Sequence, residues 1–260
     1  MSKAPSLVLF TLTYNERENL PLLVERLRAL GLPNARFVVV DDNSPDGTGK
    51  VADELSRRHP DFVTVHHRAA KEGYGAAYKD AVETIRRRFD PDRYLSMDAD
   101  LSHDPADLPR LLDRLDAGAD LAIGSRLARG SVVVGRPWMR RLTTRVANLL
   151  VARLIAGNYP VRDNTNGYRA FTREVVEAIP WDHLQANKGY SFLTSFLAIV
   201  YRKGFRIEEV PITFREREHG ASKLGFRQLF GFVGNALHLR WRISVLRLYR
   251  AERAQARPPR

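Results

Sequence analysis

Short apolar runs alternate with amphipathic stretches along the first half of the chain. The runs are rich in β-branched and aromatic residues, as buried strands are. They cover residues 6–12, 36–42, 62–67, 93–98 and 119–125. Between them, apolar residues recur with helical spacing over residues 17–30, 48–58, 74–88 and 105–117. This alternation predicts βαβ units, and therefore an α/β fold with a parallel sheet and helices on both of its faces.

Polar clusters follow four of the predicted strands. They read TYNE (13–16), DDNSPDGT (41–48), DADLSHD (98–104) and GSR (124–126). In open sheets of this kind, ligands bind beyond the carboxyl ends of the strands. We therefore expect these clusters to share one rim of the sheet and to form the functional site.

Composition narrows the classes of function and location. Cysteine is absent, which excludes disulfides, thiolate metal sites and cysteine nucleophiles and favours a reducing compartment. The apolar run over residues 7–12 is too short for a signal-peptide core. No window reaches the ~20 uninterrupted apolar residues that a spanning helix needs. We expect a protein that starts in the cytoplasm and does not cross a bilayer.

Positive charge is concentrated toward the end of the chain, whose formal net charge is +12. Residues 226–260 hold eight arginines and one glutamate and end in AERAQARPPR, a composition typical of disorder. We expect one catalytic domain over residues 1–225, followed by a basic amphipathic C-terminal segment over 226–260. The basic stretches 138–157 and 226–250 suit a membrane surface or a partner as well as core packing.

Asp98 and Asp100 form the acidic cluster that most needs an explanation. Carboxylates this close repel each other unless a cation, protons or hydrogen-bond donors neutralise them. Their hard oxygen atoms suit Mg²⁺ or Mn²⁺ bridged to a diphosphate, although a solvated acidic loop also explains the triplet taken alone. We assign structural roles to His103 and to Asp104, the latter as the N-cap before Pro105.

Two further motifs leave alternatives open on the residues alone. The DDNSPDGT stretch makes a good turn, yet Asp42 at a strand end is also placed to bond a nucleoside. Gly73 and Gly75 suit either a tight turn or a close approach to phosphate. The chain contains neither a G-x-G-x-x-G fingerprint nor a P-loop, which argues against oxidoreductases and P-loop hydrolases.

Seven motifs, taken together and in order, carry a resemblance to a known family. They are TYNERENL, VVVDDNSPDGTG, DADLSHDP, GSR, DNTNGYRAF, KGYSF and EVPITFREREHGASKLG. Over residues 7–225 the chain resembles family 2 glycosyltransferases and, within them, the dolichol- or polyprenol-phosphate mannose synthases. The resemblance implies a GT-A fold, GDP-mannose as donor, Mg²⁺ or Mn²⁺, a polyprenyl-phosphate acceptor and inversion at the anomeric carbon.

The resemblance also implies roles for individual residues. Nucleotide contacts fall on Leu12, Tyr14, Glu16, Val40 and Asp42. Metal and diphosphate contacts fall on Asp98, Ala99 and Asp100, with Asp98 and Asp100 as the metal ligands. The cations expected around the phosphates are Arg126, Arg217 and Lys223, with Arg126 also a donor contact and Arg140 and Arg215 in reserve. Together with Asp100, the first three cations form the expected catalytic set.

Three positions depart from the pattern of that family. Ser102 stands where the family often has glutamine, and its shorter side chain weakens the case for a third protein ligand to the metal. Leu193 and Ser195 stand where relatives commonly have glutamine and glutamate, which affects sugar recognition. A polyprenyl-phosphate transferase that uses UDP-glucose or another sugar nucleotide is therefore the alternative.

Other classes of function fit the residues less well. A nucleic-acid-binding module would explain the positive charge, but acidic clusters at the strand ends would repel phosphate in the absence of metal. The intact pair of Asp98 and Asp100 argues against a protein that only binds the donor.

The expected reaction places few demands on the side chains. Attack by a lipid phosphate needs no general base of unusual pKa. We expect a metal-dependent glycosyltransferase that has no nucleic-acid partner. We expect it to bind peripherally to the cytoplasmic face of an anionic membrane. A membrane-protein partner and a homo-oligomer both stay open.

Overall fold

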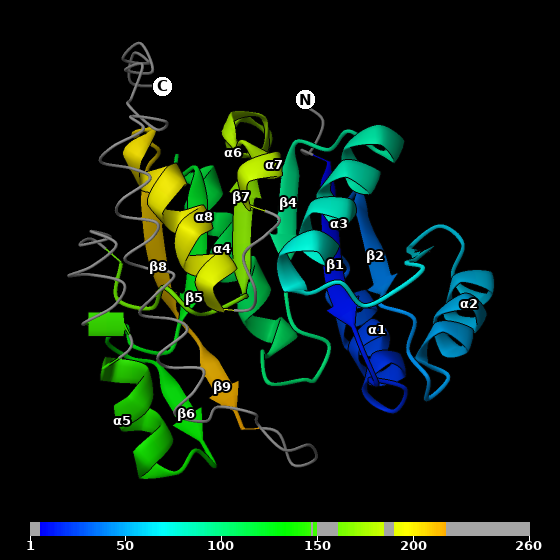
Figure 1. The fold of residues 1–260 in the computed structure, drawn as a ribbon, viewed down its shortest axis with the longest axis horizontal. Coiled ribbons are helices and arrows are strands. Elements are labelled where there is room, and N and C mark those ends of the chain that lie inside the picture. The colour runs from blue at the N-terminus through cyan, green and yellow to red at the C-terminus, as the bar shows by residue number, and fades with distance from the viewer. Residues whose placement is uncertain (1–5, 147, 150–160, 185–189, 217–260) are drawn as a thin grey trace.

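A single large sheet organises the molecule. The computed structural model describes residues 6–146, 148–149, 161–184 and 190–216. The sheet has seven strands in the order β3-β2-β1-β4-β7-β5-β8 (Figure 1). They are β1 (Leu7–Thr13), β2 (Ala35–Asp41), β3 (Val63–His67), β4 (Arg93–Ser96), β5 (Leu121–Ser125), β7 (Arg169–Thr172) and β8 (Ile207–Pro211). Neighbouring strands pair in parallel except at β7, which runs antiparallel to both β4 and β5.

Helices cover both faces of this sheet, and each face has its own apolar cluster. One cluster includes Phe10, Tyr78 and Phe196, the other Leu9, Leu23 and Leu111. On the first face lie α3 (Tyr74–Arg88), α6 (Arg173–Ala178), α7 (Trp181–Leu184) and α8 (Tyr190–Arg202) (Figure 1). On the second lie α1 (Asn19–Ala29), α2 (Thr48–Arg58) and α4 (Leu108–Asp116). Alternate residues of each strand point to opposite faces, which is why neighbours such as Leu9 and Phe10 belong to different clusters.

A second, two-stranded sheet lies beyond the carboxyl ends of β5 and β8 (Figure 1). It pairs β6 (Val132–Val134) in parallel with β9 (Thr213–Arg215), and α5 (Trp138–Val146) follows β6. An isolated bridge joins Phe214 of β9 to His103 in the loop after β4. The small sheet is therefore attached to the rim where the polar clusters gather.

The expected α/β architecture is confirmed, with one correction to the sheet. The pattern predicted parallel strands, but β7 is antiparallel and is inserted between β4 and β5. Its four residues are too short a run to stand out from the surrounding polar sequence. The helix predicted over 105–117 starts with a short 3₁₀ turn, Pro105–Asp107, before α4. Asp104 caps that turn as expected, because its carboxylate accepts from the N–H of Ala106 (3.0 Å).

Two expectations concern the end of the chain and its relation to membranes. Residues 226–260 lie outside the described residues, so the amphipathic C-terminal helix and the boundary at residue 225 stay predictions. In the part of the chain that the structure describes, no helix combines the length and apolar character needed to span a membrane.

Candidate active site

Three neighbouring loops, after β2, β1 and β4, form the rim that the sequence pointed to. Each contains a residue with a left-handed backbone, with φ of 63° at Asn15, 56° at Asn43 and 60° at Leu101. Asparagine visits this region readily, whereas leucine there costs roughly 1–2 kcal/mol. The acidic loop after β4 therefore holds a strained residue, which its surroundings must keep in place.

The loop after β1 presents an aromatic ring and an acid. Tyr14 is exposed, and the ammonium nitrogen of Lys71 lies 3.2 Å from the centroid of its ring. The backbone N–H of Glu16 donates to Thr48 Oγ1 (2.9 Å), and the Glu16 carboxylate accepts from the amide of Asn19 (2.8 Å). These contacts fix the loop against the starts of α1 and α2, so that Tyr14 and Glu16 border the rim together.

The other expected nucleotide contacts differ in their exposure. Leu12 is half-buried at the end of β1, and Asp42 is largely buried just after β2. Val40 is fully buried within β2, and its carbonyl accepts from Thr13 Oγ1 (3.3 Å). The side chain of Val40 therefore packs in the core, and a ligand at the rim has only its backbone within reach.

A buried arginine that the sequence analysis did not single out holds Asp42. Arg68 follows β3, and its guanidinium pairs with Asp42, with Asp80 (2.7 Å) and with Glu72 (2.8 Å). Burial by itself would lower the pKa of Arg68, but the hydrogen bonds to Asp80 and Asp42 raise it above its ordinary value. The charged guanidinium thus fixes the Asp42 carboxylate beside the rim. A cation directly after an apolar run was the only signal for it in the sequence.

The acidic pair lies at the end of β4 with one member more open than the other. The side chain of Asp98 is 37% exposed, whereas Asp100 is largely buried, as is Ala99 between them. Asp100 Oδ1 accepts from the N–H of Ser102 (3.0 Å), a contact that spans the strained Leu101. The carboxylate of Asp100 therefore holds the turn on which both acids are carried.

Glycine at position 167 leaves room beside Asp98. A Cβ atom at Gly167 would lie 3.2 Å from Asp98 Oδ1 and 3.2 Å from the hydroxyl of Tyr74. Both distances are closer than ordinary van der Waals contact, so any larger residue would press on the acid. The segment just before β7 thus approaches the acidic loop without a side chain at Gly167.

His103 connects the acidic loop to the rest of the rim. It is fully buried, its Nδ1 accepts from the backbone N–H of Asp98 (3.2 Å), and its Nε2 lies 2.6 Å from Asn166 Oδ1. Since Nδ1 accepts this hydrogen bond, Nε2 is the nitrogen that donates to Asn166 Oδ1. The amide of Asn166 in turn donates to the carbonyl of Gly124 in β5. The structural role expected for His103 is confirmed, and the chain of bonds joins β4, the segment before β7 and β5.

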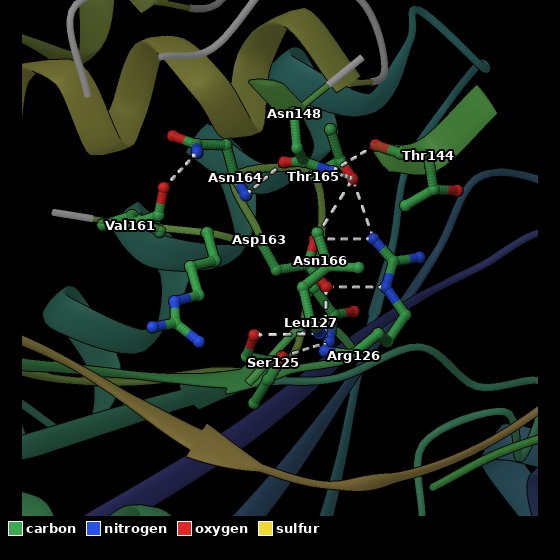
Figure 2. Close-up of polar contacts among 12 residues, drawn as sticks. Ser125, Arg126, Leu127, Thr144, Asn148, Val161, Asp163, Asn164, Thr165 and Asn166 are labelled. Carbon is green, nitrogen blue, oxygen red and sulfur yellow. Dashed lines mark hydrogen bonds and ion pairs between the residues drawn. The ribbon is translucent and has the colours of Figure 1, made fainter. Parts of the chain in front are cut away.

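Arg126 is bound to an acid that the sequence analysis did not identify. Its guanidinium donates to both oxygens of Asp163 (2.7 Å each) and to Thr165 Oγ1 (2.7 Å), and its backbone N–H donates to Asp163 Oδ2 (2.9 Å) (Figure 2). Burial would raise the pKa of Asp163, but Arg126 more than offsets it and the pKa is lowered. The charge of Arg126 is therefore matched within the protein, at the carboxyl end of β5.

The segment from Asp163 to Asn166 is held from several sides. Asn164 donates its backbone N–H to Asn148 Oδ1 (2.6 Å), which lies shortly after α5 (Figure 2). Arg169 is fully buried, and its guanidinium donates to backbone carbonyls of Asn164 and Asn166 (2.9 Å each). Burial lowers the pKa of Arg169 to about 10, so the guanidinium remains charged at neutral pH. These bonds set the path of the segment that borders the acidic loop.

The positions that depart from the family pattern are all buried. Ser102 is buried in the acidic loop, and its carbonyl accepts from the N–H of Arg215 (3.0 Å). Leu193 and Ser195 are buried in α8, and the carbonyl of Leu193 accepts from Arg169 (2.9 Å). Leu193 packs in the core cluster on the α3 and α8 side of the sheet.

The remaining expected cations lie close to the limit of the described residues. Arg140 pairs with Glu216, and Arg215 is exposed at the end of β9. Arg217 and Lys223 lie outside the described residues. The bond between Arg215 and Ser102 nevertheless shows that the chain passes the acidic loop just before it reaches position 217.

The fold, the acidic strand end and the motif order agree with one family. Residues 9–179 match glycosyl transferase family 2. The chain belongs to glycosyl transferase family 2. Its resemblance to that family is thus confirmed, and the rim described above is the candidate active site of a glycosyltransferase.

Three named enzymes are similar in sequence to this glycosyltransferase. It is 48% identical to polyprenol monophosphomannose synthase of Mycolicibacterium smegmatis over 213 residues, 82% of this chain and 78% of the relative. It is 42% identical to undecaprenyl-phosphate mannosyltransferase of Micrococcus luteus over 226 residues, 86% of this chain and 88% of the relative. It is 35% identical to dolichol-phosphate mannosyltransferase of Pyrococcus furiosus over 241 residues, 91% of this chain and 64% of the relative.

A solved structure supports the fold of the glycosyltransferase. The crystal structure of glucosyl-3-phosphoglycerate synthase from Mycobacterium tuberculosis, in complex with Mn²⁺, uridine diphosphate and phosphoglyceric acid, superposes with a TM-score of 0.65. The alignment covers 92% of this chain and 78% of that one at 18% identity. The expected GT-A architecture is therefore confirmed.

The acidic pair of the glycosyltransferase fits a divalent cation. Among the residues that the structure describes, there is no group of three or more His, Asp or Glu side chains placed to hold a metal. Mg²⁺ and similar hard ions, however, are commonly held by one or two carboxylates together with substrate phosphates. Asp98 and Asp100 supply such a pair, and the side chain of Asp98 is 37% exposed at the rim.

Proposed function

We propose that the protein transfers mannose from GDP-mannose to a polyprenyl phosphate, giving polyprenyl-phosphate mannose and GDP. The observation that carries this proposal is the similarity, over more than four fifths of the chain, to two bacterial enzymes named for mannosyl transfer to polyprenol or undecaprenyl phosphate. The acidic rim supports it, because a sugar nucleotide brings a diphosphate that needs a cation.

The proposed reaction is a direct displacement at the anomeric carbon. An oxygen of the acceptor phosphate, already anionic near neutral pH, forms the new bond to C1 as the bond from C1 to the diphosphate breaks, so the configuration inverts. The bonding electrons leave with GDP, and no general base is required. The residues need only orient the two phosphates and offset negative charge on the departing diphosphate.

We propose that different parts of the rim carry out these tasks. Asp98 and Asp100 would hold Mg²⁺ or Mn²⁺, and such an ion supplies charge stabilisation to a leaving diphosphate. Tyr14, Glu16 and Asp42 are proposed to bind the nucleoside. Arg217 and Lys223 are proposed as the cations that face the phosphates. Arg217 lies two residues after Arg215, whose backbone N–H donates to the carbonyl of Ser102 in the acidic loop.

A transfer assay with several donors tests the proposal. The protein would be incubated with Mn²⁺, a polyprenyl phosphate and labelled GDP-mannose, UDP-glucose or GDP-glucose, and organic-extractable label would be measured. We expect GDP-mannose to give the highest kcat/KM. A preference for UDP-glucose would support the alternative donor instead, for which the changes at Leu193 and Ser195 are the argument. Donor binding without transfer or hydrolysis would contradict the enzyme proposal.

The buried pair of Arg68 and Asp42 gives a prediction about nucleotide binding. Replacing Arg68 by methionine is expected to lower the free energy of unfolding by about 3 kcal/mol, because Asp42 is left buried without its partner. Affinity for GDP, measured by calorimetry, should fall with it. Arg58→Met removes an exposed arginine from α2 and should change the unfolding free energy by less than about 0.5 kcal/mol. Wild-type GDP affinity in folded Arg68→Met protein would contradict the role given to Asp42.

We also propose where the protein works. A long-chain acceptor lies in a bilayer, so an enzyme that uses it must reach the membrane surface. We propose peripheral binding to the cytoplasmic face of an anionic membrane, where each arginine near the surface contributes about 1 kcal/mol. The charge of +12 supports this, and sedimentation with anionic vesicles at low and high salt tests it.

A further inference from the structure

Exposed apolar side chains gather in one region of the described chain. Of the nine large hydrophobic side chains that are exposed there, six fall within residues 132–149. They are Val132, Val134, Trp138, Met139, Leu142 and Leu149. None of the residues of α5 is buried, and Trp138 exposes 71% of its surface. A cluster of exposed apolar side chains of this size marks a surface that a protein partner or a membrane covers.

The apolar side chains of α5 share one side of the helix. Successive helical residues are about 100° apart, which brings Trp138, Met139 and Leu142 within one arc of about 100°. Met139 exposes 61% and Leu142 53%. Such an arrangement of Trp, Met and Leu is typical of helices that lie in the boundary between headgroups and acyl chains.

The opposite side of α5 is occupied by the protein itself. Arg140 pairs there with Glu216, which follows β9. Thr144 accepts a hydrogen bond from Arg136 in the turn after β6 (2.9 Å). The helix is thus held to the small sheet through its polar side, and this leaves the apolar side facing outward.

The charge around this surface has one sign. Arg141 and Arg145 are exposed on α5 beside the apolar arc, and Arg129 is exposed before β6. Residues 121–162 contain eight arginines and neither aspartate nor glutamate. A protein partner of mixed charge gains little from such a surface, whereas an anionic lipid layer is complementary to it over its whole area.

The surface lies next to the candidate active site. Phe214 of β9 packs against the guanidinium groups of Arg126 and Arg136, with centroid distances of 5.3 Å and 5.4 Å. The same ring meets the edge of His103 at 5.9 Å. In Figure 1, α5 and β6 lie beyond the carboxyl ends of β5 and β8, on the side of the rim. A membrane or partner that covers α5 therefore lies close to the acidic loop.

We propose that α5 is the membrane-docking element of the protein. Trp138, Met139 and Leu142 enter the headgroup and upper acyl region of an anionic bilayer, and Arg145 lies against lipid phosphates. Arg141 instead helps to hold α5 to the small sheet, because its guanidinium donates to the carbonyls of Val133 (2.8 Å) and Arg136 (3.2 Å). The inference rests on the proposed function, in which the acceptor is a lipid phosphate. Docking through α5 turns the rim toward the bilayer surface, where the acceptor phosphate is found.

Vesicle binding by matched variants tests the docking element. The full chain and a Trp138→Ser/Met139→Ser/Leu142→Ser variant would be sedimented with vesicles of equal parts phosphatidylglycerol and phosphatidylcholine. We expect the partition coefficient to fall by about tenfold or more. Leu22→Ser removes an equally apolar side chain, 46% exposed on α1, and is expected to bind like the wild type. Equal binding by the wild type and the triple variant, or an equal loss in Leu22→Ser, would overturn the proposal.

A second measurement locates the contact even if the triple variant folds poorly. In a Trp181→Phe/Trp241→Phe background, Trp138 is the only tryptophan left. Lipids brominated on the upper acyl chain are expected to quench its fluorescence when the protein binds vesicles. Vesicle binding without quenching would contradict the proposal. It would show either that another surface docks, such as residues 226–260, or that a second copy of the chain covers α5.

A third measurement separates this inference from the proposed function. Transfer would be followed to a water-soluble, short-chain polyprenyl phosphate and to the long-chain acceptor in vesicles. The triple variant is expected to lose transfer to the vesicle acceptor and to keep transfer to the soluble one. If the wild type transfers sugar to neither acceptor, the proposed function is wrong. Sedimentation and fluorescence quenching would still test whether α5 docks to the membrane.

Discussion

Replacing Asp100 by alanine is expected to lower kcat/KM for sugar transfer by about 10³-fold. Asp100 is proposed to hold the cation that offsets charge on the departing diphosphate, and its loss would leave that cation with Asp98 as the one remaining carboxylate of the proposed pair. It also accepts a hydrogen bond from the Ser102 N–H across the strained Leu101. Alanine therefore removes both a negative charge and a support of the loop.

Asparagine at position 100 separates the two roles of this side chain. Asp100→Asn keeps an oxygen that can accept from Ser102 but loses the charge, so the loop should survive while Mn²⁺ binding fails. Binding of Mn²⁺ with GDP present, followed by electron paramagnetic resonance, reports on the site without relying on turnover. Asp104→Ala is the matched control, because Asp104 belongs to the same loop but caps the following turn. Full transfer by either Asp100 variant would contradict the metal role.

The second large effect concerns the pair of Arg126 and Asp163. Removing one partner of a buried ion pair typically costs 3–5 kcal/mol, because the other charge is left without compensation. Arg126→Met is therefore expected to lower the melting temperature by roughly 10 °C in calorimetry. Arg129→Met, which removes an exposed arginine nearby, should leave it almost unchanged.

A double variant tests whether the pair itself is responsible. Asp163→Leu combined with Arg126→Met removes both charges, so the double variant should be more stable than the sum of the single losses predicts. Additive losses would mean that the two side chains act independently. Transfer by Arg126→Met, measured below its melting temperature, then reports whether this arginine also reaches the donor, as the family resemblance implies.

The lowered pKa of Asp163 gives the same pair a dependence on pH. Its folded-state pKa lies below the ordinary value of 3.8, so its contribution to stability is present above that value and is lost as the pH falls through the folded-state pKa. The difference in unfolding free energy between the wild type and Asp163→Asn should therefore be constant near neutral pH. It should shrink only in strongly acidic solution. A difference that already shrinks between pH 7 and pH 5 would point to another group.

The sequence predicted the parts of the site that are local and left out those that depend on distant pairing. Asp98 and Asp100 directly follow an apolar run, and the strand-end rule is enough to place them at the rim. Asp163 lies 37 residues from Arg126. No periodicity relates the two, so Arg126 was expected to be a cation with its charge available. In the fold, that charge is already matched by Asp163.

The same limit explains the errors in the fold. β7 has only four residues, and its place between β4 and β5 depends on pairings across the sheet. Arg68 and Arg169 are two of the 42 lysines and arginines of the chain, and no sequence pattern singled them out, yet both are buried and hold loops at the rim. Composition alone predicts that an arginine is exposed, and only the tertiary contacts show which arginines are buried.

The antiparallel strand β7 divides the enzyme into two blocks that could be exchanged separately. On one side, β3, β2, β1 and β4 form an unbroken parallel unit encoded by residues 7–96, which carries the proposed nucleoside contacts up to the start of the acidic loop. On the other, β5 and β8 lead to the small sheet and α5. Chimaeras that swap the first block between relatives at the β4 edge should therefore change the preferred base while preserving the lipid acceptor.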